Sequence, residues 1–450
     1  MQRSKSKGDC RIEAESFAHP KRKNSGTARV GHGAPVFPAR SIKPPALSGD
    51  ACSPFFLFHS RHGTIPYSLF PIPSFPRSLV SVIYPLGVDH LRRIGQLRRR
   101  MTKAGLPGLL VTHLPDIRYL TGFTGSSAAL AVTKRAIRLF TDGRYATQAA
   151  AEAGSVQVEI VAASLTVSAV QWLAAQPGVE FAGFDAARTT VANLAKWKAA
   201  LPTKLRRGFF SELAAPLVES LRMVKDEDEL ALLREAALLG CKLFDHILGF
   251  IAPGLTEIEV AAELEHRARL WGAEGMSFET IAASGARSAL PHGRATAVKL
   301  PRRGFLTLDF GVILNGYCSD MTRTVYLGSP KAGERAIYQA VLEAQEAALA
   351  AVSAGVSCGE VDEAARGVLR RVGLAEAFTH STGHGVGLEI HEPPRVGAEQ
   401  TTRLQAGMVI TIEPGVYLAG QYGIRIEDMV AVTRTAGQVL TPAPKALIEL

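Results

Sequence analysis

Two helical segments of equal length, about one hundred residues apart, constrain the fold of this chain most strongly. They are GLTEIEVAAELEHRARLWG, from Gly254 to Gly272, and GVSCGEVDEAARGVLRRVG, from Gly355 to Gly373. Each has a hydroxyl residue two positions after its first glycine and a glutamate three residues later, which is the capping-box pattern of a helix start. Each also closes on glycine, a common helix terminator. The offset of 101 residues predicts an internal duplication.

Acidic residues in strand-like segments follow a similar offset, which favours duplication over a chance match of two amphipathic helices. Asp309 in LTLDFG and Glu413 in ITIEPG are 104 residues apart, and Asp320 in YCSDMT and Glu427 in GIRIED are 107 apart. Each half thus contributes two carboxylates on a pair of strands. A pseudo-twofold fold would bring the two pairs together at its centre. Glu427 adjoins Asp428, and the pattern does not say which of the two points inward.

A two-residue hairpin is predicted at Asn315-Gly316, which separates two strand-like runs. Counting back from this turn pairs Gly311 with Asp320. Asp309 lies two residues beyond Gly311 and therefore shares a face with Asp320 as a diagonal neighbour, within reach of its side chain. Asp309 also falls inside an apolar strand, where an unpaired carboxylate would be costly. We therefore interpret Asp309 and Asp320 as functional residues.

Four converging carboxylates would repel one another and force some of them to take up protons. Two divalent cations would cancel that charge. Oxygen ligands combined with one imidazole suit Mn²⁺, Co²⁺ or Zn²⁺. We therefore predict a two-metal hydrolase with five ligands, namely Asp309, Asp320, His384, Glu413 and Glu427.

The imidazole is expected from a histidine-rich segment, STGHGVGLEIHE. His384 stands between two glycines, which let the backbone approach a site closely. Together with His380, just before this segment, and His391, it makes three histidines within the 12 residues 380–391, which favours chemistry over a structural role. His292 lies on a loop rich in Gly, Ser and Pro, and spacing alone does not distinguish a functional role for it. Arg425 shares a face with Glu427 by the two-residue strand period.

The first 85 residues differ in composition from the rest of the chain. They hold 11 of the 25 prolines and 12 Lys/Arg against 4 Asp/Glu, so 8 of the 10 net positive charges lie there. We expect a disordered, basic, proline-rich extension over 1–85, with a transit segment or a mispredicted start as alternatives. Because the remainder is nearly neutral, a nucleic-acid partner is not expected.

Cysteine and hydropathy patterns bear on location. The five cysteines include no CxxC pair, which favours a reducing compartment, and we expect a cytoplasmic protein. No uninterrupted apolar run reaches 18 residues, so no membrane association is expected. Strands and helices alternate over 86–217, which predicts a separate α/β domain. A second domain over 218–450 opens with a long helix whose capping box is Asp226 and Glu229.

The motifs resemble those of the creatinase/aminopeptidase family, whose catalytic domain has the pita-bread fold. Within the family the similarity is to Xaa-Pro aminopeptidases and Xaa-Pro dipeptidases. The matching segments are ASGARSALPHGRAT, LDFGVILNGYCSDMTRTV, STGHGVGLEIHEPP, ITIEPGVY and GIRIEDMV, with YLTGFTGSSAALAV and LFTDGRYATQA upstream. The resemblance implies an α/β protein. Its pita-bread catalytic domain, with an internal pseudo-twofold duplication, would follow a smaller creatinase-like N-terminal domain.

The resemblance also implies roles for individual residues. All five metal ligands are present. His292 and His391 would contact the scissile carbonyl and stabilise the tetrahedral intermediate, and Glu413 would also handle a proton. His380 and Arg425 would support the substrate site.

The activity implied is that of a dinuclear exopeptidase acting on the Xaa-Pro bond at peptide N-termini. We predict an Xaa-Pro aminopeptidase, with an Xaa-Pro dipeptidase (prolidase) as the alternative. A catalytically inactive binding protein of the same fold is disfavoured because every ligand is present. The expected cofactor is two divalent ions, Mn²⁺ first, with Co²⁺ or Zn²⁺ as alternatives. The expected partners are a proline-containing peptide and, in a homodimer, a second copy of the chain.

Overall fold

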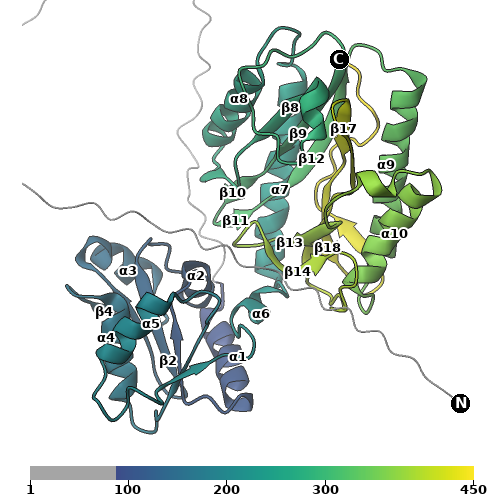
Figure 1. Cartoon of the computed structure of the whole chain (residues 1–450). Coiled ribbons are helices and arrows are strands. Elements are labelled where there is room, and N and C mark those ends of the chain that lie inside the picture. Colours follow the sequence, from purple (N-terminus) through teal and green to yellow (C-terminus); the bar gives the residue numbers. More distant parts are fainter. Residues whose placement is uncertain (1–87) are drawn as a thin grey trace, which may run out of the picture. The chain divides into compact units, whose positions relative to one another are not determined.

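The computed structural model describes residues 88–450, so the extension predicted over 1–85 lies outside the described residues. Two regions built of sheets and helices follow one another along this part of the chain (Figure 1). The predicted domain boundary near residue 217 stays a prediction. Among the helices of residues 88–450, none is long and apolar enough to cross a membrane.

The first region is a six-stranded mixed sheet with helices on both faces. Its strand order is β4-β3-β2-β1-β5-β6, with β1 antiparallel to β2 and parallel to β5. All six residues of β2 are buried because its alternate side chains enter two different cores, with Leu130 in one and Ala131 in the other. The strands are β1 (Gly108–Val111), β2 (Ala128–Thr133), β3 (Ile137–Thr141), β4 (Gln157–Ile160), β5 (Ala182–Phe184) and β6 (Phe210–Glu212). The helices are α1 (His90–Lys103), α2 (Leu114–Thr121), α3 (Ala146–Glu152), α4 (Leu165–Ala174), α5 (Val191–Ala199) and α6 (Glu219–Arg222).

The second region begins with α7 (Glu227–Leu248), and its start is the one predicted. The Asp226 side chain accepts a hydrogen bond from the Glu229 backbone N–H, and the Glu229 side chain accepts one from the Asp226 N–H. The same reciprocal capping box opens α8 (Glu257–Leu270) and α10 (Cys358–Arg371). The three capping boxes predicted from sequence are therefore confirmed.

The two halves of this region repeat one arrangement of helices and strands. In the first half, α7 and α8 pack on β8 (Ile281–Ser284), β9 (Gly304–Phe310) and β12 (Met321–Leu327). In the second half, α9 (Ala332–Ala351) and α10 pack on a sheet containing β13 (Gly383–Gly385), β15 (Val409–Ile412) and β18 (Asp428–Val432). Figure 1 shows α8 on one side of these strands and α9 with α10 on the other.

Matching backbone contacts extend the repeat beyond the helices. Thr256, the N-cap of α8, forms an antiparallel bridge with Lys299, and Ser357, the N-cap of α10, forms one with Arg403. The glycines two residues before the caps adopt nearly equal left-handed angles, φ 95° and φ 97°. These pairs give the predicted duplication a three-dimensional counterpart.

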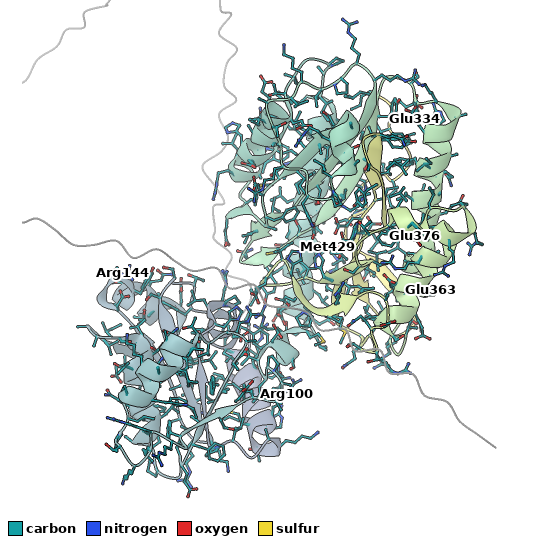
Figure 2. The ribbon with its side chains drawn as sticks, viewed as in Figure 1. Arg100, Arg144, Glu334, Glu363, Glu376 and Met429 are labelled. Carbon is teal, nitrogen blue, oxygen red and sulfur yellow. The ribbon has the colours of Figure 1, made fainter. Side chains whose placement is uncertain are left out.

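Side chains fill the space between the helices and the sheets (Figure 2). Met429 on β18 is fully buried inside the second region, whereas Glu363 lies on the outer side of α10 and is largely exposed. The remaining strands are β7 (Gly275–Met276), β10 (Val312–Leu314), β11 (Tyr317–Cys318), β14 (Glu392–Val396), β16 (Gly415–Leu418), β17 (Tyr422–Arg425) and β19 (Gly437–Val439). The described part of the chain also contains three short 3₁₀ helices, η1 (Gly143–Tyr145), η2 (Gly285–Ala289) and η3 (Ala375–Ala377).

The hairpin has the predicted turn, but it is divided between two sheets. Leu314 pairs with Tyr317 across Asn315-Gly316, and the same register continues beyond the break, where Met321 pairs with Phe310. The strands break at Gly311, where the backbone passes so close to the Ser319 carbonyl that a Cβ would lie 1.7 Å from its oxygen. β10 and β11 join β7, while β9 and β12 join β8.

Candidate functional site

Four carboxylates meet where two pairs of antiparallel strands end. Asp309 is the penultimate residue of β9, and Asp320 directly precedes β12. In the second half, Glu413 directly follows β15 and Glu427 directly precedes β18. All four line one cavity of about 730 Å³. The structure therefore brings together the carboxylates that the sequence pattern paired.

The hairpin register sets the relation between the first two carboxylates. Asp309 pairs with Thr322, so Asp320 lies two residues away on the facing strand, as a diagonal neighbour. Arg425 and Glu427 reach the cavity in a different way from the one predicted. Arg425 and Glu427 were expected on one strand, but β17 ends at Arg425 and β18 begins after Glu427. Both still line the cavity, because the chain passes from one sheet to another between them.

His384 faces the carboxylates from β13. A Cβ at Gly383 would lie 1.9 Å from the Thr411 carbonyl oxygen, so glycine is required for this close approach of two strands. The His384 Nδ1–H donates a hydrogen bond to the Gly385 carbonyl at 3.0 Å, which leaves Nε2 with a free lone pair. Nε2 lies 3.5 Å from Asp320 and 3.6 Å from Glu413. Burial lowers the pKa of His384 to about 4, so the imidazole is neutral.

The charges of this cluster are unbalanced. Burial, together with the facing carboxylates, raises the pKa of Asp320 and of Glu413 well above the usual range. Burial and Asp309 raise the pKa of Glu427 to about 8. The Oδ1 atom of Asp309 is buried and has no hydrogen-bond partner. These oxygens fit divalent cations, which would neutralise the cluster and satisfy the free oxygen.

One subset of this cluster has the spacing of a metal site by itself. Asp320, His384 and Glu427 each offer one ligand atom, and these three atoms lie within 4.8 Å of one another.

A guanidinium lies beside the carboxylates. Arg425 is buried and donates to Asp309 Oδ2, to the Tyr417 hydroxyl at 2.6 Å and to the Pro291 carbonyl at 3.1 Å. The Tyr417 hydroxyl lies 2.9 Å from Nε2 of His380, whose Nδ1 lies 2.9 Å from the Ser381 carbonyl. Burial, then Arg425, lowers the pKa of His380 to about 4. A chain of hydrogen bonds thus links Arg425 to His380 along the cavity wall.

The two remaining predicted histidines, His292 and His391, line the same cavity. His391 stacks edge-on against His384, with ring centroids 4.4 Å apart. Burial, then repulsion from His292, lowers the pKa of His391. All nine predicted site residues therefore line one cavity.

Threonine and tyrosine side chains that the sequence analysis missed position the charged groups. Thr322 donates to Glu427 at 2.7 Å and accepts from Arg425 Nε at 3.1 Å. Thr411 accepts from the His384 backbone N–H at 3.0 Å and donates to Glu413 at 3.4 Å. Thr322 and Thr411 each lie two residues along the chain from a predicted ligand, Asp320 and Glu413 respectively, so the two-residue period held a signal for them. Tyr417 had no such signal.

Fold and cavity together define a metal-dependent peptidase, and comparisons with known proteins agree. Residues 231–434 match the model of metallopeptidase family M24, and residues 93–224 match the Creatinase/Prolidase N-terminal domain. A Bacillus subtilis (strain 168) protein named uncharacterized peptidase YqhT is 37% identical over 360 residues, 80% of this chain and 100% of the relative. This chain belongs to metallopeptidase family M24, and the pita-bread fold expected from its motifs is confirmed.

Other relatives carry more specific names. The Xaa-Pro dipeptidase of Pyrococcus furiosus is 42% identical over 232 residues, 52% of this chain and 67% of the relative. A solved Xaa-Pro dipeptidase from Bacillus anthracis is 39% identical, with a TM-score of 0.77 over 80% of this chain and 100% of the other. A solved X-Pro aminopeptidase from Thermotoga maritima is 33% identical, with a TM-score of 0.72 over 78% of this chain and 100% of the other.

Proposed function

We propose that this metallopeptidase hydrolyses the Xaa-Pro bond of dipeptides. The observation that carries the catalytic part is the convergence of four carboxylates and the neutral His384 in one cavity. The dipeptidase specificity rests on similarity, because the dipeptidase from Bacillus anthracis exceeds the aminopeptidase from Thermotoga maritima in both identity and TM-score. The aminopeptidase expected from the sequence becomes the second candidate, supported by that same aminopeptidase structure.

The residues proposed to hold two divalent cations are the five predicted ligands, Asp309, Asp320, His384, Glu413 and Glu427. When bound, the cations supply Lewis-acid polarisation of the scissile carbonyl and make water a competent nucleophile at neutral pH. Mn²⁺ is the proposed metal. Homodimerisation and a cytoplasmic location stay predictions.

The side chains around these ligands have separate proposed roles. Glu413 holds the proton taken from the attacking water and passes it to the leaving prolyl nitrogen. His391 and His292 donate hydrogen bonds to the carbonyl oxygen as negative charge develops on it. Arg425 keeps Asp309 oriented through its hydrogen bond to Oδ2. His380 supports the substrate site less directly than His391 and His292, since its Nε2 is hydrogen-bonded to the Tyr417 hydroxyl.

Hydrolysis of two peptides separates the candidates. The chelated enzyme is assayed with Ala-Pro and with Ala-Pro-Ala, with and without added Mn²⁺. Metal-dependent cleavage of Ala-Pro alone is the expected result. Cleavage of both peptides would establish the aminopeptidase instead. Failure to cleave either peptide with Mn²⁺, Co²⁺ or Zn²⁺ would refute both and favour the binding protein.

A further inference from the structure

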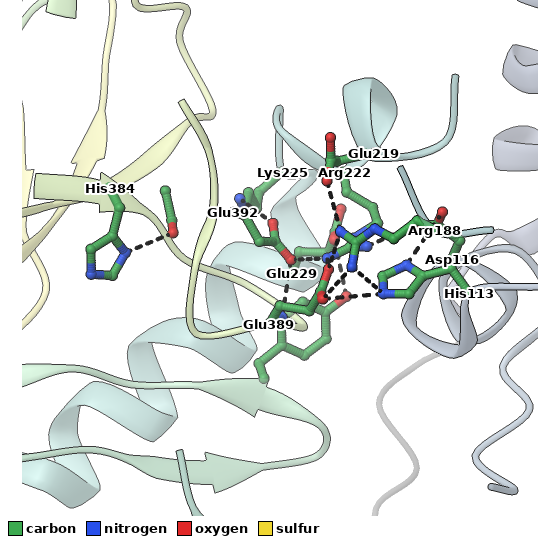
Figure 3. A network of polar contacts seen from close by, with 12 residues as sticks. His113, Asp116, Arg188, Glu219, Arg222, Lys225, Glu229, His384, Glu389 and Glu392 are labelled. Atoms are coloured by element: carbon green, nitrogen blue, oxygen red, sulfur yellow. Dashed lines mark hydrogen bonds and ion pairs between the residues drawn. The ribbon is translucent and has the colours of Figure 1, made fainter. Parts of the chain in front are cut away.

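The segment between β13 and β14 connects the cavity to the N-terminal region of the chain. In this segment and at the start of β14, four consecutive residues from Ile390 to Pro393 line the cavity, while the carboxylates of Glu389 and Glu392 enter a network of charges with Arg222 (Figure 3). The Glu392 carboxylate also accepts from the Glu389 backbone N–H at 3.0 Å, which closes the turn that carries His391. Contacts that fix the Glu392 carboxylate therefore also restrict the position of His391, the preceding residue.

Arg222, the last residue of α6, makes the central contacts of this network. It is 1% exposed. One terminal nitrogen donates to Asp116 at 2.7 Å, and the other donates to Glu389 at 2.7 Å and to Glu392. Lys225 adds a second contact to Glu392 at 3.2 Å. Burial raises the pKa of Glu389, but hydrogen bonds from His113 and Arg222 and their positive charges outweigh burial and lower the pKa to about 2, so the carboxylate is ionised.

The N-terminal region supplies the other end of the network. Asp116 lies on α2, and His113 and Arg188 contact Glu389 directly at 3.1 Å and 3.3 Å. Leu388, in the same segment as Glu389, packs against the apolar core formed by α1, α2 and β1. Polar and apolar contacts thus both tie the segment that carries His391 to the first region of the fold.

We infer that Arg222 is a positioning residue for His391, through which the N-terminal region sets the geometry of the active site. This inference rests on the proposed function, because it assigns Arg222 a role in that reaction. The planar guanidinium can bind carboxylates on two sides at once, and a lysine ammonium cannot reproduce that fork. A small displacement of a catalytic group lowers turnover strongly even when substrate still binds.

A second buried arginine provides a matched control. Arg93 on α1 is 2% exposed and pairs with Asp226 at 3.0 Å and with Glu229 at 3.2 Å. Arg93 therefore also joins the N-terminal region to the second region of the fold through two carboxylates. Neither of these carboxylates lies in the segment that carries His391.

The test compares Arg222→Lys with Arg93→Lys in the full, Mn²⁺-loaded chain. We expect Arg222→Lys to lower kcat for Ala-Pro by about tenfold or more, with KM changed less than about threefold. Arg93→Lys should keep kcat within about twofold of the wild type, although both variants lose stability in urea. Equal kcat values for the two variants would overturn the inference.

A second readout does not depend on turnover. The rate at which diethyl pyrocarbonate modifies His391, followed by peptide mass, should change several-fold in Arg222→Lys and stay unchanged in Arg93→Lys. If the wild type does not cleave Ala-Pro, the proposed function fails, and this rate still tests the positioning of His391. If Arg222→Lys does not fold, Asp116→Asn is used instead, because it weakens the ion pair that holds Arg222 from the N-terminal region. It should lower kcat in the same direction, and an unchanged kcat with an unchanged His391 rate would overturn the inference.

Discussion

Arg323 and Asp428 form an ion pair that is almost fully buried behind the cavity, with Nη2 and Oδ1 2.8 Å apart and side chains 1% and 0% exposed. Arg323 also donates to the backbone carbonyl of Glu427. This pair decides which of the two adjacent acids, Glu427 or Asp428, faces the cavity. Asp428 is held by Arg323 and by Lys445, whereas Glu427 faces the other carboxylates.

Removing Arg323 should destabilise the fold strongly. Arg323→Met leaves the buried Asp428 carboxylate with Lys445 as its remaining ion-pair partner among the described residues, beside hydrogen bonds from Gln345 and Thr441. Removing one partner of a buried ion pair costs about 3–5 kcal/mol. Lys445→Met is the matched control, because Lys445 is 22% exposed and leaves the Arg323 contact intact. It should cost about 1 kcal/mol. Urea denaturation measures both variants, and equal losses would contradict this role of Arg323.

Metal binding should stabilise the folded chain as well as activate it. The facing carboxylates Asp320, Glu413 and Glu427 repel one another without a cation, so the folded chain should gain stability when Mn²⁺ binds. By mass action, Mn²⁺ at one hundred times its Kd should add about 2.7 kcal/mol per site to the free energy of unfolding. Thermal unfolding of the chelated protein, with and without Mn²⁺, measures this gain. Asp320→Asn should reduce it, whereas Glu363→Gln, which changes an exposed carboxylate on α10, should not. An undiminished gain in Asp320→Asn would remove Asp320 from the ligands.

The stability contribution of Glu389 should depend on pH in one direction. Its pKa is about 2 in the folded chain, against an ordinary value of 4.5, so its carboxylate stabilises the fold above pH 4.5. The contribution is lost as pH falls from 4.5 toward 2. Glu389→Gln should therefore cost about 1–2 kcal/mol at pH 7, after allowance for solvent screening, and progressively less below pH 4.5. Urea midpoints at pH 7, 5 and 3.5 test this, and a constant gap would argue against it.

Gly311 should tolerate no side chain. A Cβ there would lie 1.7 Å from the Ser319 carbonyl oxygen, at the point where β9 and β12 present Asp309 and Asp320. Gly311→Ala should force the strands apart, cost about 2–3 kcal/mol and weaken Mn²⁺ binding. Gly333→Ala is the control, because a Cβ at Gly333 meets no atom within 4 Å. Isothermal titration with Mn²⁺ and urea denaturation distinguish the two, and wild-type values for Gly311→Ala would refute the steric argument.

Local patterns predicted much of this fold because their causes lie within a few residues. The capping boxes of α7, α8 and α10 involve residues three apart, and the Asn315-Gly316 turn sets the register that makes Asp309 and Asp320 neighbours. The short helices α2, α4 and α5 were missed. In α2 the N-cap residue is His113, whose side chain makes no capping hydrogen bond, so the usual start signal is missing there.

The sequence by itself indicated the residues proposed as ligands, apart from the choice between Glu427 and Asp428, and the repeat that brings the two halves of the site together. Only the tertiary structure decided that Glu427 rather than Asp428 faces the cavity, because the partner of Asp428 lies 105 residues away on another strand. The same holds for Arg222, whose carboxylate partners lie 106, 167 and 170 residues from it. A buried charge is stable only beside its partners, and contacts over such separations leave no periodic mark in the sequence.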